Sequence, residues 1–111
     1  MNHEKLKCYR LLASIAEEIA RRVTRWPKGN AYLADQITRA IASSVLNLAE
    51  GNGKKRFGKE RHRFFAISLG SIAEVSACLD LARAFGLIQR CAQESLKSKL
   101  RLAYIKIEAL P

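Results

Sequence analysis

Two short polar motifs carry the residue types that could perform acid–base chemistry in this chain. Asn47 and Glu50 are three residues apart, and Ser71 and Glu74 repeat that spacing further along. Residues three apart lie on one face of a helix, so each motif places a carboxylate beside a second polar side chain. Antiparallel neighbouring helices could bring the two pairs together. Such a cluster could be a catalytic carboxylate pair or a buried polar network that fixes helix register.

The spacing favours the structural interpretation of these motifs. Glu50 precedes an expected helix end, where a carboxylate is unfavourable by about 0.3–1 kcal/mol unless a cation such as Arg63 offsets it. Di-metal sites in bundles need Glu-x-x-His pairs, and neither His3 nor His62 stands three residues after a Glu. We therefore expect no metal, no cofactor and no enzymatic activity. The expected structural network consists of Asn47, Glu50, Arg63, Ser71 and Glu74.

Two basic clusters could bind nucleic-acid phosphates. The chain has 20 Lys and Arg against 10 Asp and Glu, a formal net charge of +10, and such an excess favours polyanionic partners. The alternative for each cluster is a solvated basic turn. No base-reading motif is visible, so the expected contacts, to RNA or DNA, are independent of sequence. The expected nucleic-acid-binding residues are Lys54, Lys55, Arg56, Lys59 and Arg61 in one cluster and Arg21, Arg22 and Arg25 in the other.

Cysteine usage and the N-terminal residues predict a cytoplasmic protein. Cys8, Cys78 and Cys91 are odd in number and form no CxxC motif, which predicts reduced thiols. The first residues do not form a signal peptide, because Arg10 and Glu17 bound an apolar stretch that is too short. No apolar run reaches the roughly 18 residues that a membrane span requires, so no membrane partner is expected.

Helical periodicity runs from end to end and predicts a single domain over residues 1–111. Apolar residues recur at spacings of three and four, and the β-branched residues show no period-two alternation. Short connections predict antiparallel neighbours, hence an all-α, up-down-up-down four-helix bundle. Gly51 is expected to end the second helix in a left-handed cap. The expected helices are Glu4 to Arg25, Ala31 to Glu50, Lys59 to Phe85 and Arg90 to Leu110.

The third expected helix is apolar around almost its whole circumference. From Phe64 to Phe85 it reads FFAISLGSIAEVSACLDLARAF. A helix that is apolar all round must be covered all round, which three neighbours do not easily do, so we expect a homo-oligomer. The alternative is that alanines and serines on its outer face are exposed to water. Ala66, Gly70 and Ala73 form a row of small residues that would let another backbone approach closely.

The segment from Leu33 to Ile88 carries a combination of features found together in one family. They are Gln36-Ile37, Ser44, Asn47, Ala49-Glu50-Gly51, Arg63-Phe64, Gly70-Ser71, Glu74 and Gly86-Leu87-Ile88. Through them the chain resembles the four-helix bundle proteins encoded by intervening sequences of 23S rRNA genes. The resemblance implies a homopentameric ring. It also implies kinship with the accessory variability determinant proteins of diversity-generating retroelements, which look like basic pentameric barrels that bind nucleic acid and a reverse transcriptase.

Together these features predict a non-enzymatic, basic, oligomeric bundle that binds nucleic acid through backbone phosphates without sequence specificity. The alternative is a protein-interaction scaffold that docks a nucleic-acid-processing partner such as a reverse transcriptase. The first function follows from the basic clusters, and the second from the resemblance.

Overall fold

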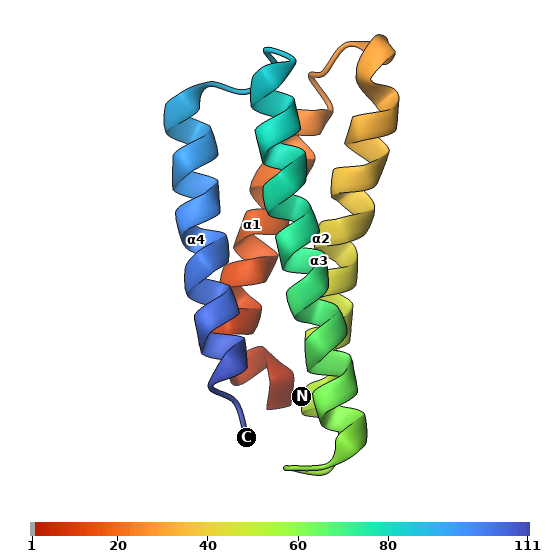
Figure 1. The fold of residues 1–111 in the computed structure, drawn as a ribbon, viewed down its shortest axis with the longest axis vertical. Coiled ribbons are helices and arrows are strands. Elements are labelled where there is room, and N and C mark those ends of the chain that lie inside the picture. Colours follow the sequence, from red (N-terminus) through yellow and green to blue (C-terminus); the bar gives the residue numbers. More distant parts are fainter. Residues whose placement is uncertain (1) are drawn as a thin grey trace.

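Four α-helices make up most of the computed structural model, which describes residues 2–111. They are α1 (Lys7–Val23), α2 (Ala31–Asn52), α3 (Lys59–Ala84) and α4 (Arg90–Glu108). Short 3₁₀ helices, η1 (Asn2–Lys5) and η2 (Lys28–Asn30), precede α1 and α2, and no strand occurs within the described residues. The helices run alternately up and down (Figure 1), so the expected all-α four-helix bundle is confirmed.

Each helix packs against two others, and the apolar stripes of all four meet in one core. α1 and α3 both contact α2 and α4, in a bundle 43 Å long and 23 by 21 Å across. Within each helix the buried positions recur at spacings of about three and four, as the sequence pattern predicted. The largest fully buried apolar side chains are Leu12, Ile15, Ile19, Ile37, Leu48, Val75, Leu79, Leu96, Leu100 and Ile107.

Small residues explain why α2 and α3 make the most extensive contact of any helix pair. Ser44 and Ser68 are fully buried between them. The Ser68 Oγ donates a hydrogen bond of 2.7 Å to the Ser44 carbonyl oxygen, and the Ser44 Oγ donates one of 2.7 Å to the Ile41 carbonyl oxygen. Both buried hydroxyls are therefore satisfied, and their small size lets the two backbones approach closely.

The end of α2 differs from the expected left-handed cap at Gly51. α2 continues through Gly51 to Asn52, and Gly53 follows in a right-handed conformation with φ −82°. Gly51 is buried against Phe65, and a Cβ built on it would lie 2.8 Å from two carbons of that ring. Gly51 therefore provides space for an aromatic side chain, and the expectation of a left-handed cap is wrong.

A left-handed glycine does end α3. Gly86 has φ +75°, the Leu87 N–H donates to the Ala82 carbonyl (2.8 Å), and the Gly86 N–H donates to the Arg83 carbonyl (3.1 Å). This pair of bonds is the Schellman motif, which satisfies carbonyls at a helix end. The remaining boundaries lie within three residues of those expected: α1 is shorter at both ends, and α3 and α4 stop one and two residues early.

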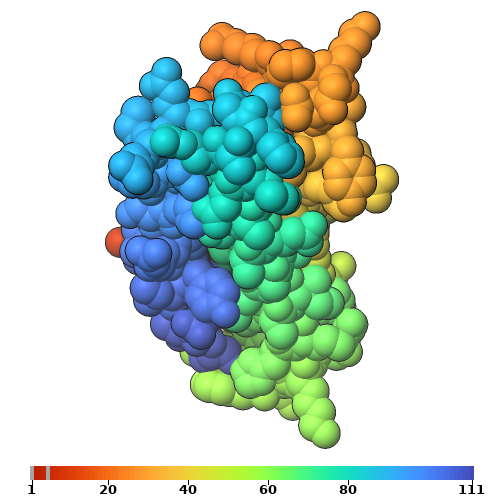
Figure 2. Space-filling model, turned by 45° about the horizontal axis from the view of Figure 1, so that its top comes forward, coloured from red at the N-terminus to blue at the C-terminus, as the bar shows by residue number. Residues whose placement is uncertain are grey.

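The outer face of α3 is apolar and uncovered within one protomer. Ala66, Gly70 and Ala73 are exposed, and nothing lies within 4 Å of a Cβ built on Gly70. Ile67 and Leu81 are also exposed, by 40% and 48%. Figure 2 shows α3 and α4 side by side on this face of the molecule. The expected row of small residues is therefore exposed, and Gly70 has open space in front of it.

α3 also corrects the expectation that no apolar stretch reaches the length of a membrane span. Its length and composition suffice to cross a membrane, although only 33% of its most apolar window is buried inside the protomer. One such helix is weak evidence for a membrane segment, because core helices of soluble proteins pass the same test. The low burial shows that the other helices of the protomer cover only part of this apolar surface.

We expect Gly51→Ala to destabilise the fold. The added methyl group would meet the Phe65 ring at 2.8 Å, and overpacking of this kind costs about 1–3 kcal/mol, which outweighs the gain of alanine over glycine in a helix. Urea unfolding should therefore show a lower midpoint with an unchanged slope. Gly29→Ala is the matched control, because a Cβ there meets nothing within 4 Å. Equal midpoints for both variants would contradict the packing role.

Candidate nucleic-acid interface

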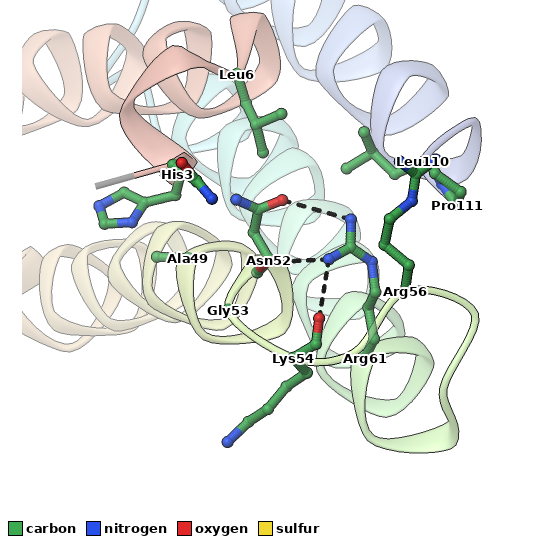
Figure 3. Close-up of a pocket in the computed structure, with 11 residues that line it drawn as sticks. His3, Leu6, Ala49, Asn52, Gly53, Lys54, Arg56, Arg61, Leu110 and Pro111 are labelled. Carbon is green, nitrogen blue, oxygen red and sulfur yellow. Dashed lines mark hydrogen bonds between the residues drawn. The ribbon is translucent and has the colours of Figure 1, made fainter.

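Arg61 joins the end of α2 to the start of α3 (Figure 3). Its side chain is only 5% exposed. The Nη1 donates to the carbonyl oxygens of Asn52 (3.1 Å), Lys54 (3.3 Å) and Gly51 (3.4 Å), and the Nη2 donates to Asn52 Oδ1 (3.4 Å). Carbonyls at a helix C-terminus lack intrahelical partners, and a cation there is favourable. Arg61 therefore caps α2 from the following helix.

This position corrects the expectation for Arg61. The sequence places it among five clustered cations that meet phosphates on the surface. In the structure its guanidinium is buried over the Phe65 ring, 4.9 Å from the centroid, and burial is the main cause that lowers its pKa. Arg61 is thus a structural residue of the turn rather than a member of the exposed patch.

The remaining cations of this cluster stand on the loop 53–58 and the first turn of α3. Lys55, Arg56 and Lys59 are exposed, and none of them forms an ion pair with another residue in the range 2–111. Lys54 differs, because its Nζ lies 3.8 Å from Glu50 Oε2. The exposed patch is therefore Lys55, Arg56 and Lys59, three cations without a neutralising carboxylate.

Phe57 gives this loop its shape. It is the one non-glycine residue with positive φ (62°) among residues 2–111, a conformation that costs a bulky side chain about 1–2 kcal/mol. Its N–H donates a 2.9 Å hydrogen bond to the Pro111 carbonyl oxygen, and the Gly58 N–H donates one of 3.0 Å to the Lys55 carbonyl oxygen. The loop backbone is therefore anchored on both sides of the exposed cations.

The structure brings together only part of the expected polar network. The Asn47 Nδ2 donates to the Ser43 carbonyl oxygen (2.8 Å) and to Ser43 Oγ (3.1 Å). The Ser71 Oγ donates to the same Ser43 Oγ at 2.8 Å, so Asn47 and Ser71 are linked across α2 and α3. Ser43 was missed by sequence reasoning. Its only signal was its place one turn before Asn47.

The charged members of the network lie elsewhere. Glu50 is paired with Lys54 and is largely exposed, whereas Arg63 pairs with Glu60 at 3.3 Å. The Arg63 guanidinium lowers the pKa of the exposed Glu60 carboxyl. Glu74 is exposed on α3. The expected pair of Glu50 with Arg63 is wrong, because each side chain has an oppositely charged neighbour three or four residues away on its own chain segment.

The second basic cluster lies at the opposite end of the bundle, near the turn between α1 and α2 (Figure 1). Arg21 and Arg25 are exposed, whereas the Arg22 Nε pairs with Glu18 Oε2 at 2.9 Å. These arginines and the half-buried Trp26 line a hollow of about 600 Å³. Trp26 also packs against the core. The two basic clusters are thus separated along the long axis and form no single patch on one protomer.

The thiols and carboxylates offer little for other chemistry. Cys8 and Cys78 are buried, and burial raises the pKa of both thiols, while Cys91 is exposed; all three are free. Among residues 2–111, no group of three or more His, Cys, Asp and Glu is arranged to hold a metal ion. The Asp80 carboxyl is hydrogen-bonded to Lys97, which lowers its pKa and joins α3 to α4.

These features define a class: a four-helix bundle with a buried core and exposed basic turns at both ends. The profile of the 23S rRNA-intervening sequence protein family matches residues 4–107, and the chain belongs to this family. The match extends beyond Leu33 to Ile88, the segment that carries the resemblance, into α1 and α4. No curated protein matches the chain.

We expect Arg61→Met to lower the free energy of unfolding by about 1–3 kcal/mol, because methionine fills a similar volume but leaves the carbonyls of Asn52 and Lys54 without the Arg61 donor. Lys59→Met is the control, since Lys59 is exposed and forms no ion pair with the described residues. It should change stability by less than about 0.5 kcal/mol. Chemical denaturation followed by circular dichroism measures both. An Arg61→Met variant as stable as the parent would show that the cap is dispensable.

Proposed function

We propose that this protein is a non-enzymatic, cytoplasmic, ring-forming bundle that binds nucleic acid through backbone phosphates without sequence specificity. The observation that carries the proposal is the exposed patch of Lys55, Arg56 and Lys59. These cations have no neutralising carboxylate, and backbone hydrogen bonds anchor the loop beside them. A net charge of +10 adds long-range attraction for any polyanion. Phosphates are the contacts that such side chains favour, and they carry no sequence information.

The uncovered face of α3 supports assembly into a ring. α4 also exposes apolar residues, Leu102 by 48% and Ile105 by 55%, and exposed apolar surface of this kind marks interaction sites. The family resemblance favours a homopentamer. A closed ring would repeat the exposed patch at the same level in every protomer, and such multivalency can raise avidity about 10²–10⁴-fold when one strand reaches several patches.

A scaffold that docks a nucleic-acid-processing protein is the second candidate. It follows from the proposed kinship with accessory variability determinant proteins, whose partner is a reverse transcriptase. Exposed apolar residues on α2 favour it, since Tyr32 and Leu46 are 78% and 66% exposed. Large apolar side chains on a helix other than the α3–α4 face would suit a second protein contact.

Replacing Lys55, Arg56 and Lys59 together by Gln should weaken nucleic-acid binding and flatten its salt dependence. Each phosphate contact contributes about 0.7–0.9 to the slope of log K against log salt, so the slope should fall by about 2–3. Fluorescence anisotropy with RNA and DNA of unrelated sequences, at several salt concentrations, measures this. The loss should be about equal for all sequences.

The control for the triple variant is the replacement of Arg90, Lys99 and Arg101 by Gln. These exposed α4 residues carry the same total charge, so the two variants have equal net charge. If both variants show the same loss of affinity and the same fall in salt slope, binding depends on overall charge rather than on the exposed patch. If the parent binds neither RNA nor DNA at low salt, the proposed function is wrong.

Light scattering of the parent should give a mass five times that of one chain. Gly70→Leu should shift it towards the monomer, because a bulky side chain on the row of small residues would separate the packed faces, while the monomer has open space there. Ala20→Leu, at an exposed position on α1 that takes no part in the proposed interface, is the control and should leave the mass unchanged. A parent that is monomeric at micromolar concentration would exclude the ring.

A further inference from the structure

A hollow of about 870 Å³ opens at the end of the bundle where η1, the end of α2, the loop 53–58 and the last residues of the chain meet (Figure 3). None of the residues that line it carries a carboxylate side chain, whereas Lys54, Arg56 and Arg61 are cationic. The Lys54 side chain points away from Arg61 in Figure 3. The hollow is therefore walled by two guanidinium groups and by no carboxylate side chain.

Arg61 has one donor left after it caps α2. Its Nε is buried and has no hydrogen-bond partner, the one such side-chain atom found among the described residues. A buried donor without a partner is unfavourable. Arg56 lies beside Arg61 at the hollow (Figure 3), is exposed, and forms no ion pair or hydrogen bond through its side chain with residues 2–111. Its positive charge also contributes to the lowered pKa of Arg61, after burial.

We propose that this hollow seats the terminal phosphate monoester of a nucleic-acid strand between Arg56 and Arg61, an inference that rests on the proposed function. A monoester carries a charge of about −1.5 to −2 at neutral pH, so it can offset two guanidinium groups where an internal diester offsets one. Because the Arg61 Nε is closed off from solvent, the neighbouring side chains must shift before a phosphate oxygen can accept its hydrogen.

The apolar part of the lining fits the rest of a terminal nucleotide. Leu110 and Pro111 lie near Arg56, and Leu6 reaches the hollow from the N-terminal segment (Figure 3); a sugar or base attached to the phosphate can make contact with these side chains. A cavity of this volume is in the range that holds small ligands. An internal phosphate, continued by chain on both sides, fits such an end-on hollow less well than a strand end does.

The test compares two oligonucleotides of one sequence, one with a 5′ phosphate and one with a 5′ hydroxyl group. The parent should bind the phosphorylated strand about tenfold more tightly, the effect expected of one charge-assisted contact. Arg56→Gln should abolish this preference. Lys55→Gln, which removes the same charge from the same loop but does not line the hollow, should weaken both strands alike and keep the preference.

Arg61→Lys tests the proposed phosphate site separately from the role of Arg61 at the end of α2. Lysine keeps a positive charge near the α2 carbonyls but has no equivalent of Nε, so a folded Arg61→Lys variant should also lose the preference. If it does not fold, Arg56→Gln still decides the question. Inorganic phosphate is the second probe, and it should fail to displace the phosphorylated strand at concentrations equal to that of the strand.

The outcomes distinguish this inference from the function on which it rests. Equal binding of the two strands by the parent, or an equal preference in parent and Arg56→Gln, overturns the phosphate seat alone. Displacement by inorganic phosphate at the strand's own concentration overturns the strand end as ligand. No binding of either strand at low salt overturns the proposed function itself.

Discussion

The guanidinium of Arg61 on the last carbonyls of α2 is the interaction on which this end of the molecule depends. The Gly53 and Lys54 N–H groups already pair with the carbonyls of Ala49 to Gly51, and Arg61 adds donors to the carbonyls of Gly51, Asn52 and Lys54 from seven to ten residues further along the chain. The same contacts fix where α3 begins relative to α2. The loop between them is consequently held as an ordered projection that carries Lys55, Arg56 and Lys59 outward.

Close packing of α2 on α3 has a second effect. Because Ser44, Ser68 and Gly51 let these two helices approach closely, α3 turns its polar and aromatic residues towards α2 and leaves Ala66 and Gly70 outside. An apolar helix that is only partly covered is stable in water when another surface covers the rest. The contact with α2 and the proposed ring interface therefore lie on two sides of α3.

The helices and their buried stripes could be predicted because helical periodicity is a local property. The site was less predictable, since its decisive contacts join residues distant in sequence. Gly51 was interpreted through its backbone, but its role is set by Phe65, fourteen positions away. Arg61 and Lys59 both carry a positive charge, and only the fold decides which of them is buried. Ser43 had no charge to mark it, yet it links Asn47 to Ser71.

The separation of the two basic clusters has a consequence for the size of any bound nucleic acid. The bundle is 43 Å long, and duplex DNA rises about 3.4 Å per base pair. A duplex laid along one protomer would therefore need about 13 base pairs, a little over one helical turn, to touch both ends. Anything shorter can engage a single end only. Under the proposed function, such a surface would select nucleic acids by length, and the length of a fragment would matter more than the order of its bases.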